Sequence, residues 1–362
     1  MKYVFVSHGL LTGGRSDFDA VASLSSLVRF AKIKKLTYNK DYFLCMTDYF
    51  NGGLNILKNY YNSLIIIADI PPEVLIDMYK RDGFINFFSY LKWRNNNRLI
   101  FLDHHPSNYY VLKFLKNVKN RHIFDYFEFH DVDYEKDRLI PLNKKYCAAE
   151  RVQHFLFKFK YVKDDGVFFK LRVFAHDQDF GIRKIEEALN ITYVIGADYN
   201  NEKLIHLLSE GQFWNNELEE VKKRHIALTE ELCSKMKLKK IETNIKVDNN
   251  KRIPKTIYYA LLPEDKRLKV SAAAAHIFRN YQCDFIILFQ RTPFFSIRLP
   301  IKETDVSAAR IAALFGGGGH YGAASVNQKN KGKFQFPYNY IDENNFENIV
   351  NNVNNIISNY YC

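Results

Sequence analysis

The chain has 362 residues, which is too long for one ordinary hydrophobic core and predicts two domains. With 47% hydrophobic and 25% charged residues, the composition is that of a soluble globular protein and excludes an extended low-complexity chain. The net charge of +12 (52 basic minus 40 acidic side chains) favours an anionic partner such as nucleic acid, a nucleotide or a membrane surface.

The first residues, MKYVFVSHG, lack the apolar segment and the cleavage site of a signal peptide. No segment approaches the run of about 18 apolar residues that a membrane-spanning helix needs. The five cysteines stand singly without a CxxC pair, which argues against a zinc ribbon or a disulfide framework and fits a reducing compartment. We therefore expect a cytoplasmic protein that has no membrane partner.

The first 200 residues alternate between short apolar runs and helical patterns. The apolar runs have strand length and cover residues 2–7, 64–70 and 98–105. Helical spacing is found over 17–32 and 145–160, and another apolar stretch, 167–181, ends in charged residues where a further strand is expected to end. Continuous apolar runs are typical of parallel strands that are buried on both faces. This half is therefore predicted to be an α/β domain with a parallel sheet.

The second half begins with a charged, helical pattern over about 201–240. Beyond it, strands are expected over 256–262, 284–290 and 294–299, and helices over 271–281, 307–315 and 343–360. The predicted organisation is a domain over 1–200, a helical connector over 201–240 and a smaller α/β domain over 241–362, with a cleft between the two domains.

Acidic and histidine side chains recur where strands of the first domain are expected to end. These places are His8 with Asp17 and Asp19, then Asp69, then Asp103-His104-His105, then Asp177 with Asp179. Parallel strands bring their carboxyl ends to one edge, so these groups can converge. Mixed histidine and carboxylate ligands suit divalent ions such as Mn²⁺, and several carboxylates can bridge two ions about 3.5–4 Å apart.

Each place also has a plainer interpretation when it is taken alone. DFD (17–19) is a common helix cap, Asp69 could simply end a strand at a turn, and HDQD (176–179) could be a solvated loop. Two adjacent histidines beside an apolar run seldom serve packing. The occurrence of all four places in order favours a shared metal site.

These motifs resemble those of the DHH phosphoesterase family. The resemblance rests on SHG…DFDAVAS, IIIADIPP, LDHHPSN and FAHDQDFG, and FGGGGHYGAAS (315–325) looks like the signature of the companion DHHA1 domain. The two signatures lie about 210 residues apart, and the resemblance covers nearly the whole chain.

The resemblance implies two Mn²⁺ ions per chain, with Mg²⁺ or Co²⁺ as alternatives. The implied ligands are His8, Asp17 and Asp69 for one ion, and Asp19, Asp69, His104 and Asp177 for the other. A hydroxide shared by the ions would be the nucleophile. His105 would contact the phosphate or the leaving group, and Asp103 would orient a histidine.

Two features of this chain depart from the family pattern. Eight residues separate His8 from Asp17, which we interpret as an insertion of seven residues, LLTGGRS (10–16). In the fourth motif either Asp177 or Asp179 can be the ligand, and Asp177 is preferred.

In the second domain, the glycine run is expected to bind substrate through exposed backbone N–H groups. The expected substrate contacts are Gly317, Gly318, Gly319 and His320, together with His105 and with Arg298, whose planar guanidinium suits a phosphate. A flexible linker is the alternative interpretation of the run.

The predicted function is hydrolysis of short single-stranded RNA or DNA, as in nanoRNases and oligoribonucleases. Alternatives are a cyclic dinucleotide phosphodiesterase, a 3′-phosphoadenosine 5′-phosphate phosphatase, a single-strand-specific exonuclease and a non-catalytic nucleotide sensor. Type II pyrophosphatases share the first domain but lack the GGGGH run. The resemblance leaves a homodimer as one expectation.

Overall fold

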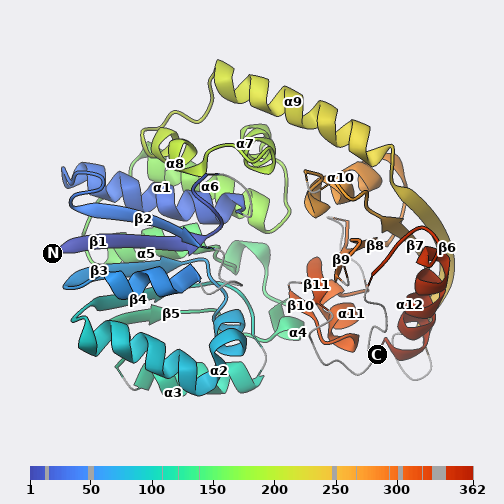
Figure 1. Cartoon of the computed structure of the whole chain (residues 1–362), viewed down its shortest axis with the longest axis horizontal. Coiled ribbons are helices and arrows are strands. Elements are labelled where there is room, and N and C mark those ends of the chain that lie inside the picture. The colour runs from blue at the N-terminus through green and yellow to red at the C-terminus, as the bar shows by residue number, and fades with distance from the viewer. Residues whose placement is uncertain are drawn as a thin grey trace. The chain divides into compact units, whose positions relative to one another are not determined.

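A computed structural model describes residues 1–12, 16–47, 53–107, 109–120, 122–137, 139–246, 251–265, 267–292, 294–300, 305–319, 321–327 and 340–361. The chain divides into two compact units, each of which has its own β-sheet (Figure 1). The first unit comprises Met1–Asp133 and Ile140–Lys223, and the second comprises Tyr134–Leu139 and Arg224–Cys362. The predicted α/β class, with a parallel sheet in the N-terminal part, is confirmed.

The sheet of the first unit has five parallel strands in the order β2-β1-β3-β4-β5. Their bounds are β1 (Lys2–His8), β2 (Tyr42–Thr47), β3 (Ser63–Ala68), β4 (Arg98–Leu102) and β5 (Tyr126–Glu128). The three apolar runs that were predicted to be strands are β1, β3 and β4, and they lie side by side in the sheet. Every residue of β3 is buried, as its continuous apolar sequence requires.

Helices cover both faces of this sheet (Figure 1). One face packs against α1 (Phe18–Ile33), α5 (Ala148–Lys158), α6 (Gly166–Asp179), α7 (Glu186–Gly196) and α8 (Asn201–Ser209). The other packs against η2 (Gly53–Asn59), α2 (Pro72–Ser89), η3 (Tyr90–Arg94) and α3 (Tyr109–Asn120). Ile66 faces the first set of helices and its neighbours Ile65 and Ile67 face the second, because successive strand side chains point to opposite faces.

Residues 167–181 do not end a strand, contrary to the prediction. They lie mainly in helix α6, whose N-cap Asp165 accepts hydrogen bonds from the N–H groups of Val167 and Phe168. The buried residues Phe168, Leu171 and Phe174 recur every three positions, which is a helical period. Asp177 and Asp179 therefore lie at the C-terminal end of a helix.

The predicted connector over 201–240 contains three different elements. Helix α8 buries Leu204, Ile205 and Leu208 in the core of the first unit, and α9 (Asn216–Cys233) spans the division between the units. Residues 237–240 were expected to be helical but belong to strand β6 (Lys237–Lys246), which pairs with β7 along its whole length. Cross-strand pairing here outweighs the helical propensity of the lysines.

The second unit has a six-stranded sheet in the order β10-β11-β9-β8-β7-β6, in which only β7 and β8 are parallel. Its further strands are β7 (Arg252–Leu261), β8 (Phe285–Phe289), β9 (Phe294–Arg298), β10 (Gly318–Gly319) and β11 (Ala323–Asn327). One face packs against α11 (Ala308–Leu314) and α12 (Phe346–Tyr360), and the other against α10 (Val270–Asn280). The short α4 (Tyr134–Asp137) also belongs to this unit, and η4 (Leu142–Lys144) belongs to the first.

Among the helices of the described ranges, none combines the length and the apolar character that crossing a bilayer would need.

Candidate metal centre

Three neighbouring strands place acidic and histidine side chains at one edge of the first sheet. His8 ends β1, Asp69 follows β3, and Asp103, His104 and His105 follow β4. The N–H of Asp69 donates to Leu102 O at 3.0 Å, so the strand pairing continues to the site. Asp69 has a φ of +56°, a backbone conformation that non-glycine residues seldom adopt outside turns and functional sites.

The first group at this edge is His8, Asp17 and Asp69. His8 Nε2 lies 3.3 Å from Asp17 Oδ2 and 3.2 Å from Asp69 Oδ2. Asp17 is also the N-cap of α1, where its Oδ1 accepts from the N–H of Ala20 at 3.0 Å. Burial alone would lower the pKa of His8, but the two carboxylates raise this pKa well above its usual value. The helix-cap interpretation of Asp17 and its place in the group are therefore compatible.

Asn201, the first residue of helix α8, connects the two ends of the insertion 10–16 and so keeps Asp17 near His8. The side-chain amide of buried Asn201 donates to Leu10 O and to Ser16 Oγ, each at 2.7 Å. The two ends of the insertion are thus held together, although eight residues separate His8 from Asp17. No motif in the sequence marks Asn201, because its partners lie more than 180 positions away.

The second group is Asp19, His104 and Asp179. His104 Nε2 lies 3.4 Å from Asp19 Oδ2 and 3.3 Å from Asp69 Oδ1, whereas its Nδ1 lies 3.5 Å from Asp179 Oδ2. Burial, followed by the charges of neighbouring carboxylates, raises the pKa of both Asp19 and Asp179 well above the usual range. Carboxyl groups placed so close together are stable in their ionised forms only when positive charge or hydrogen-bond donors lie beside them.

The N-terminus of α5 partly meets that need at Asp19. Its two carboxylate oxygens accept from the N–H groups of Ala148 and Ala149 at 2.6 and 2.8 Å. Unpaired N–H groups and the helix dipole both favour a negative charge at this position. Glu150, three residues after the N-cap Cys147, is the sequence signal that could have located this helix start.

Asp179, and not Asp177, faces the cluster, which reverses the preference drawn from the sequence. The buried carboxylate of Asp177 accepts from the N–H groups of Lys184 and Ile185 at 2.9 and 3.3 Å and from Gln178 Nε2 at 2.8 Å. Two residues along a helix turn the side chain by about 200°, so both aspartates cannot point the same way. Asp177 holds the turn after α6.

His105 and Asp103 form a tightly bonded pair beside the two groups. Asp103 Oδ1 lies 2.8 Å from His105 Nδ1, and Oδ2 accepts from the N–H of His105 at 2.9 Å. Because an ionised carboxylate can only accept, Nδ1 carries a proton in this pair. Burial by itself lowers the pKa of His105, but Asp103 raises this pKa to about 9. The carboxylate therefore fixes the direction of the ring and favours its protonated form.

The donor set fits divalent cations. Three overlapping groups have ligand atoms within 4.8 Å of one another: His8, Asp17 and Asp69; Asp19, His104 and Asp179; and Asp69, His104 and His105. Asp179 Oδ2 is buried and makes no hydrogen bond with any described residue. Nitrogen and carboxylate donors of this kind suit Mn²⁺, Zn²⁺ or similar ions. Burial of several carboxylates together is costly unless cations compensate their charge.

In the second unit, Arg298 ends strand β9, where its Nη1 donates to Ile297 O at 3.1 Å and to Ala324 O at 3.3 Å. Gly318 and Gly319 form strand β10, which pairs with β11, so this part of the run is not a flexible linker. A Cβ on Gly317 would lie 2.1 Å from Ser325 O, so packing alone requires glycine there. His320 lies outside the described residues, and substrate binding by this set stays a prediction.

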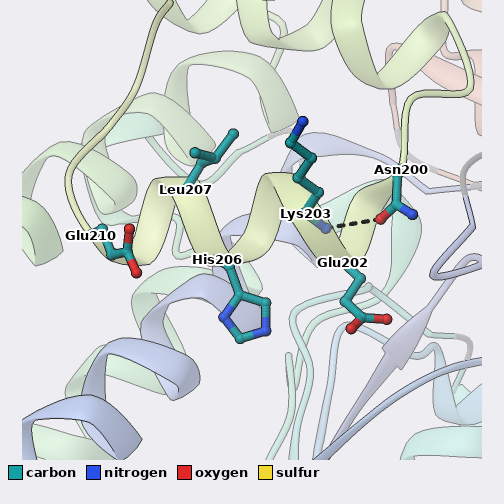
Figure 2. Close-up of a pocket in the computed structure, with 6 residues that line it drawn as sticks. All are labelled: Asn200, Glu202, Lys203, His206, Leu207 and Glu210. Carbon is teal, nitrogen blue, oxygen red and sulfur yellow. Dashed lines mark hydrogen bonds between the residues drawn. The ribbon is translucent and has the colours of Figure 1, made fainter. Parts of the chain in front are cut away.

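The surface pocket in Figure 2 runs along helix α8 and contains none of the candidate metal ligands. It is lined by Asn200, Glu202, Lys203, His206, Leu207 and Glu210. Two carboxylates, one ammonium group and one imidazole give it no single charge preference. We assign no ligand to it.

No family model matches the chain, and no curated protein does. Among solved structures, it is similar to an exopolyphosphatase-related protein from Bacteroides fragilis, with 14% identity, coverage of 97% of this chain and 91% of that chain, and a TM-score of 0.47. It is also similar to an uncharacterised protein from Helicobacter pylori G27, with 14% identity, coverage of 98% and 99%, and a TM-score of 0.37.

Proposed function

We propose that the chain is a metal-dependent phosphodiesterase that hydrolyses short single-stranded oligonucleotides. The observation that carries the proposal is the convergence of His8, Asp17, Asp19, Asp69, His104 and Asp179 from two helices and three strands into overlapping groups of metal-ligand geometry. The motif order that resembles DHH phosphoesterases supports the same chemistry, and the net charge of +12 agrees with an anionic substrate.

The six residues would form two sites, one for each cation. His8, Asp17 and Asp69 would hold one cation, and Asp19, His104 and Asp179 the other, with Asp69 close enough to both histidines to serve each group. Divalent cations, when bound, supply Lewis-acid activation of water and of the phosphate. Mn²⁺ is the ion that we propose, with two per chain.

His105 would act on the substrate directly. Its Nδ1 is engaged with Asp103, so the proton that it exchanges with a phosphate or leaving oxygen would be the one on Nε2. Asp103 keeps the ring in place during that transfer, as carboxylates do for catalytic histidines. In the second unit, Arg298 and the glycine run are the groups that we propose for binding phosphate.

The test is hydrolysis of a substrate panel with added Mn²⁺ by the wild type, Asp69→Ala, His104→Ala and a control, His206→Ala, in the pocket of Figure 2. The panel holds a dinucleotide, a five-residue and a twenty-residue RNA, the matching DNA, cyclic di-AMP and 3′-phosphoadenosine 5′-phosphate. We expect turnover that falls at least about 100-fold in both site variants and is unchanged in the control.

The pattern across the panel separates the candidate substrates. Fastest cleavage of the dinucleotide or the five-residue RNA supports the proposal. Fastest cleavage of cyclic di-AMP, of the phosphoadenosine or of the longest strand would transfer the assignment to that substrate. No turnover, with fewer than one Mn²⁺ bound per chain, would refute the enzyme and leave the nucleotide sensor.

A further inference from the structure

Glu150 joins the two helices that supply the carboxylates of the second metal group. Its Oε2 accepts from the N–H of Cys147 at 2.9 Å, at the start of α5, and lies 2.9 Å from Nδ1 of His176 on α6. Glu150 and His176 are both mostly buried, with side chains 13% and 20% exposed. One oxygen atom thus connects the first turn of α5 to the last turn of α6.

Each end of this connection leads directly to a metal-site carboxylate. At the α5 end, the N–H groups that follow Cys147, those of Ala148 and Ala149, bind both oxygens of Asp19. At the α6 end, His176 lies three residues before Asp179 and so almost on the same helix face. The ring of Phe180 contacts His176, with centroids 4.8 Å apart, and lies 6.2 Å from the ring of His104.

The contact between Glu150 and His176 lies at the two helix ends that hold the carboxylates of the second group. Asp19 belongs to α1 and Asp179 to α6, and His104 lies between them at 3.4 and 3.5 Å. A displacement of α5 relative to α6 would move the amides that hold Asp19 while Asp179 stayed in place. Metal affinity depends strongly on such outer contacts, which commonly change it by about 10–100-fold.

We infer that Glu150 is a positioning residue that sets the distance between Asp19 and Asp179 and thereby the affinity of the second cation. The inference rests on the proposed function, because it presumes that this group binds a metal. Glu150 itself would contact neither the cation nor the substrate. Its role is to hold the N-terminus of α5 against α6 through Cys147 and His176.

The test is a Mn²⁺ titration of the full-length protein, followed by the electron paramagnetic resonance signal of the free ion, which counts bound ions and gives the affinity of each. In Glu150→Ala we expect one ion to bind about 10–100-fold more weakly while the other is unchanged. Glu150→Gln keeps an oxygen that accepts from Cys147, so it should recover most of the loss. His176→Ala, which removes only the α6 contact, should weaken the same ion.

Gln153 provides the matched control, because it joins the same helices one turn away from the metal site. Its buried Nε2 donates to Ser26 Oγ on α1 at 3.0 Å and to Phe168 O on α6 at 2.9 Å. Gln153→Ala should lower the urea midpoint and leave both Mn²⁺ affinities unchanged. A purely structural role for Glu150 would make the two variants behave alike.

The inference is overturned if Glu150→Ala binds two ions with wild-type affinity, or if Gln153→Ala weakens Mn²⁺ binding by the same factor as Glu150→Ala. If circular dichroism shows that Glu150→Ala does not fold, wild-type Mn²⁺ affinities in His176→Ala overturn it. A wild-type chain that binds no Mn²⁺ would refute the proposed function as well. The two failures are distinguishable because the second already occurs in the wild type.

Discussion

The substitution Gly317→Ala tests whether packing against strand β11 requires glycine at position 317. A Cβ at this position would lie 2.1 Å from Ser325 O and 2.8 Å from Val326 Cγ2, so strand β11 must move by about an ångström to admit it. Overpacking of this kind costs about 1–3 kcal/mol, while the lower entropy of the unfolded alanine chain returns about 0.4–1 kcal/mol. We therefore expect a net loss of about 1–2 kcal/mol in the free energy of unfolding.

The measurement is thermal and urea unfolding of the full chain by circular dichroism, with limited proteolysis to assign the transition to the second unit. For a unit of about 150 residues, this loss corresponds to a decrease in Tm of about 2–8 °C. Gly322→Ala is the matched control, since a Cβ there meets no atom within 4 Å. If Gly317→Ala unfolds at the same midpoint as the wild type, or if both variants lose the same stability, the steric argument is refuted. Close approach of a ligand would then explain the glycine at position 317 better than packing does.

Three further predictions concern the first unit. Asp179→Asn should abolish binding of one Mn²⁺ ion and lower kcat at least about 100-fold. Asp177→Asn should mainly lower Tm, because the Asp177 carboxylate accepts hydrogen bonds from the N–H groups that follow α6. A Mn²⁺ titration and a melting curve of each variant distinguish these two effects. Mn²⁺ at 100 times its Kd should add about 2.7 kcal/mol to the free energy of unfolding for each bound ion and so raise the Tm of the wild type. In differential scanning fluorimetry, Asp69→Ala should lose most of this gain. Partial burial alone would raise the pKa of Asp165, but hydrogen bonds from Arg29 and from the start of α6 lower it. The stability that this pair contributes should therefore be present above about pH 3.9 and be lost as the pH falls through the lower folded-state pKa. When the urea midpoint is plotted against pH, its decrease at low pH should be less steep in Arg29→Met than in the wild type.

Much of the site was accessible from the sequence because of one geometric rule. The runs at 2–7, 64–70 and 98–105 are apolar enough to be recognised as buried parallel strands, and such strands share one carboxyl edge. The convergence of Asp69 with the histidines at the ends of β1 and β4 follows from that edge alone. Local chemistry likewise marks Asp17, whose type and position before an apolar helical pattern predict a cap.

Other features depend on contacts that no local pattern contains. The stretch 167–181 was expected to end a strand, and its buried period of about three residues is meaningful only once the surface that it packs against is known. Strand β6 is similar, since its lysine-rich start becomes a strand only through pairing with β7.

The amino-acid sequence by itself determined which residue types meet at the candidate metal centre, because their order along parallel strands and the first helix is a local property. Tertiary structure alone decided which of Asp177 and Asp179 joins them, because the direction of a helical side chain depends on how the whole helix packs. It alone also supplied Asn201, the contact of Glu150 with His176 and the bonds from the α5 amides to Asp19, because these partners are distant in sequence. Hydrogen bonds between such distant residues form only after the sheet and its covering helices have assembled, so they could not be derived from spacing along the chain.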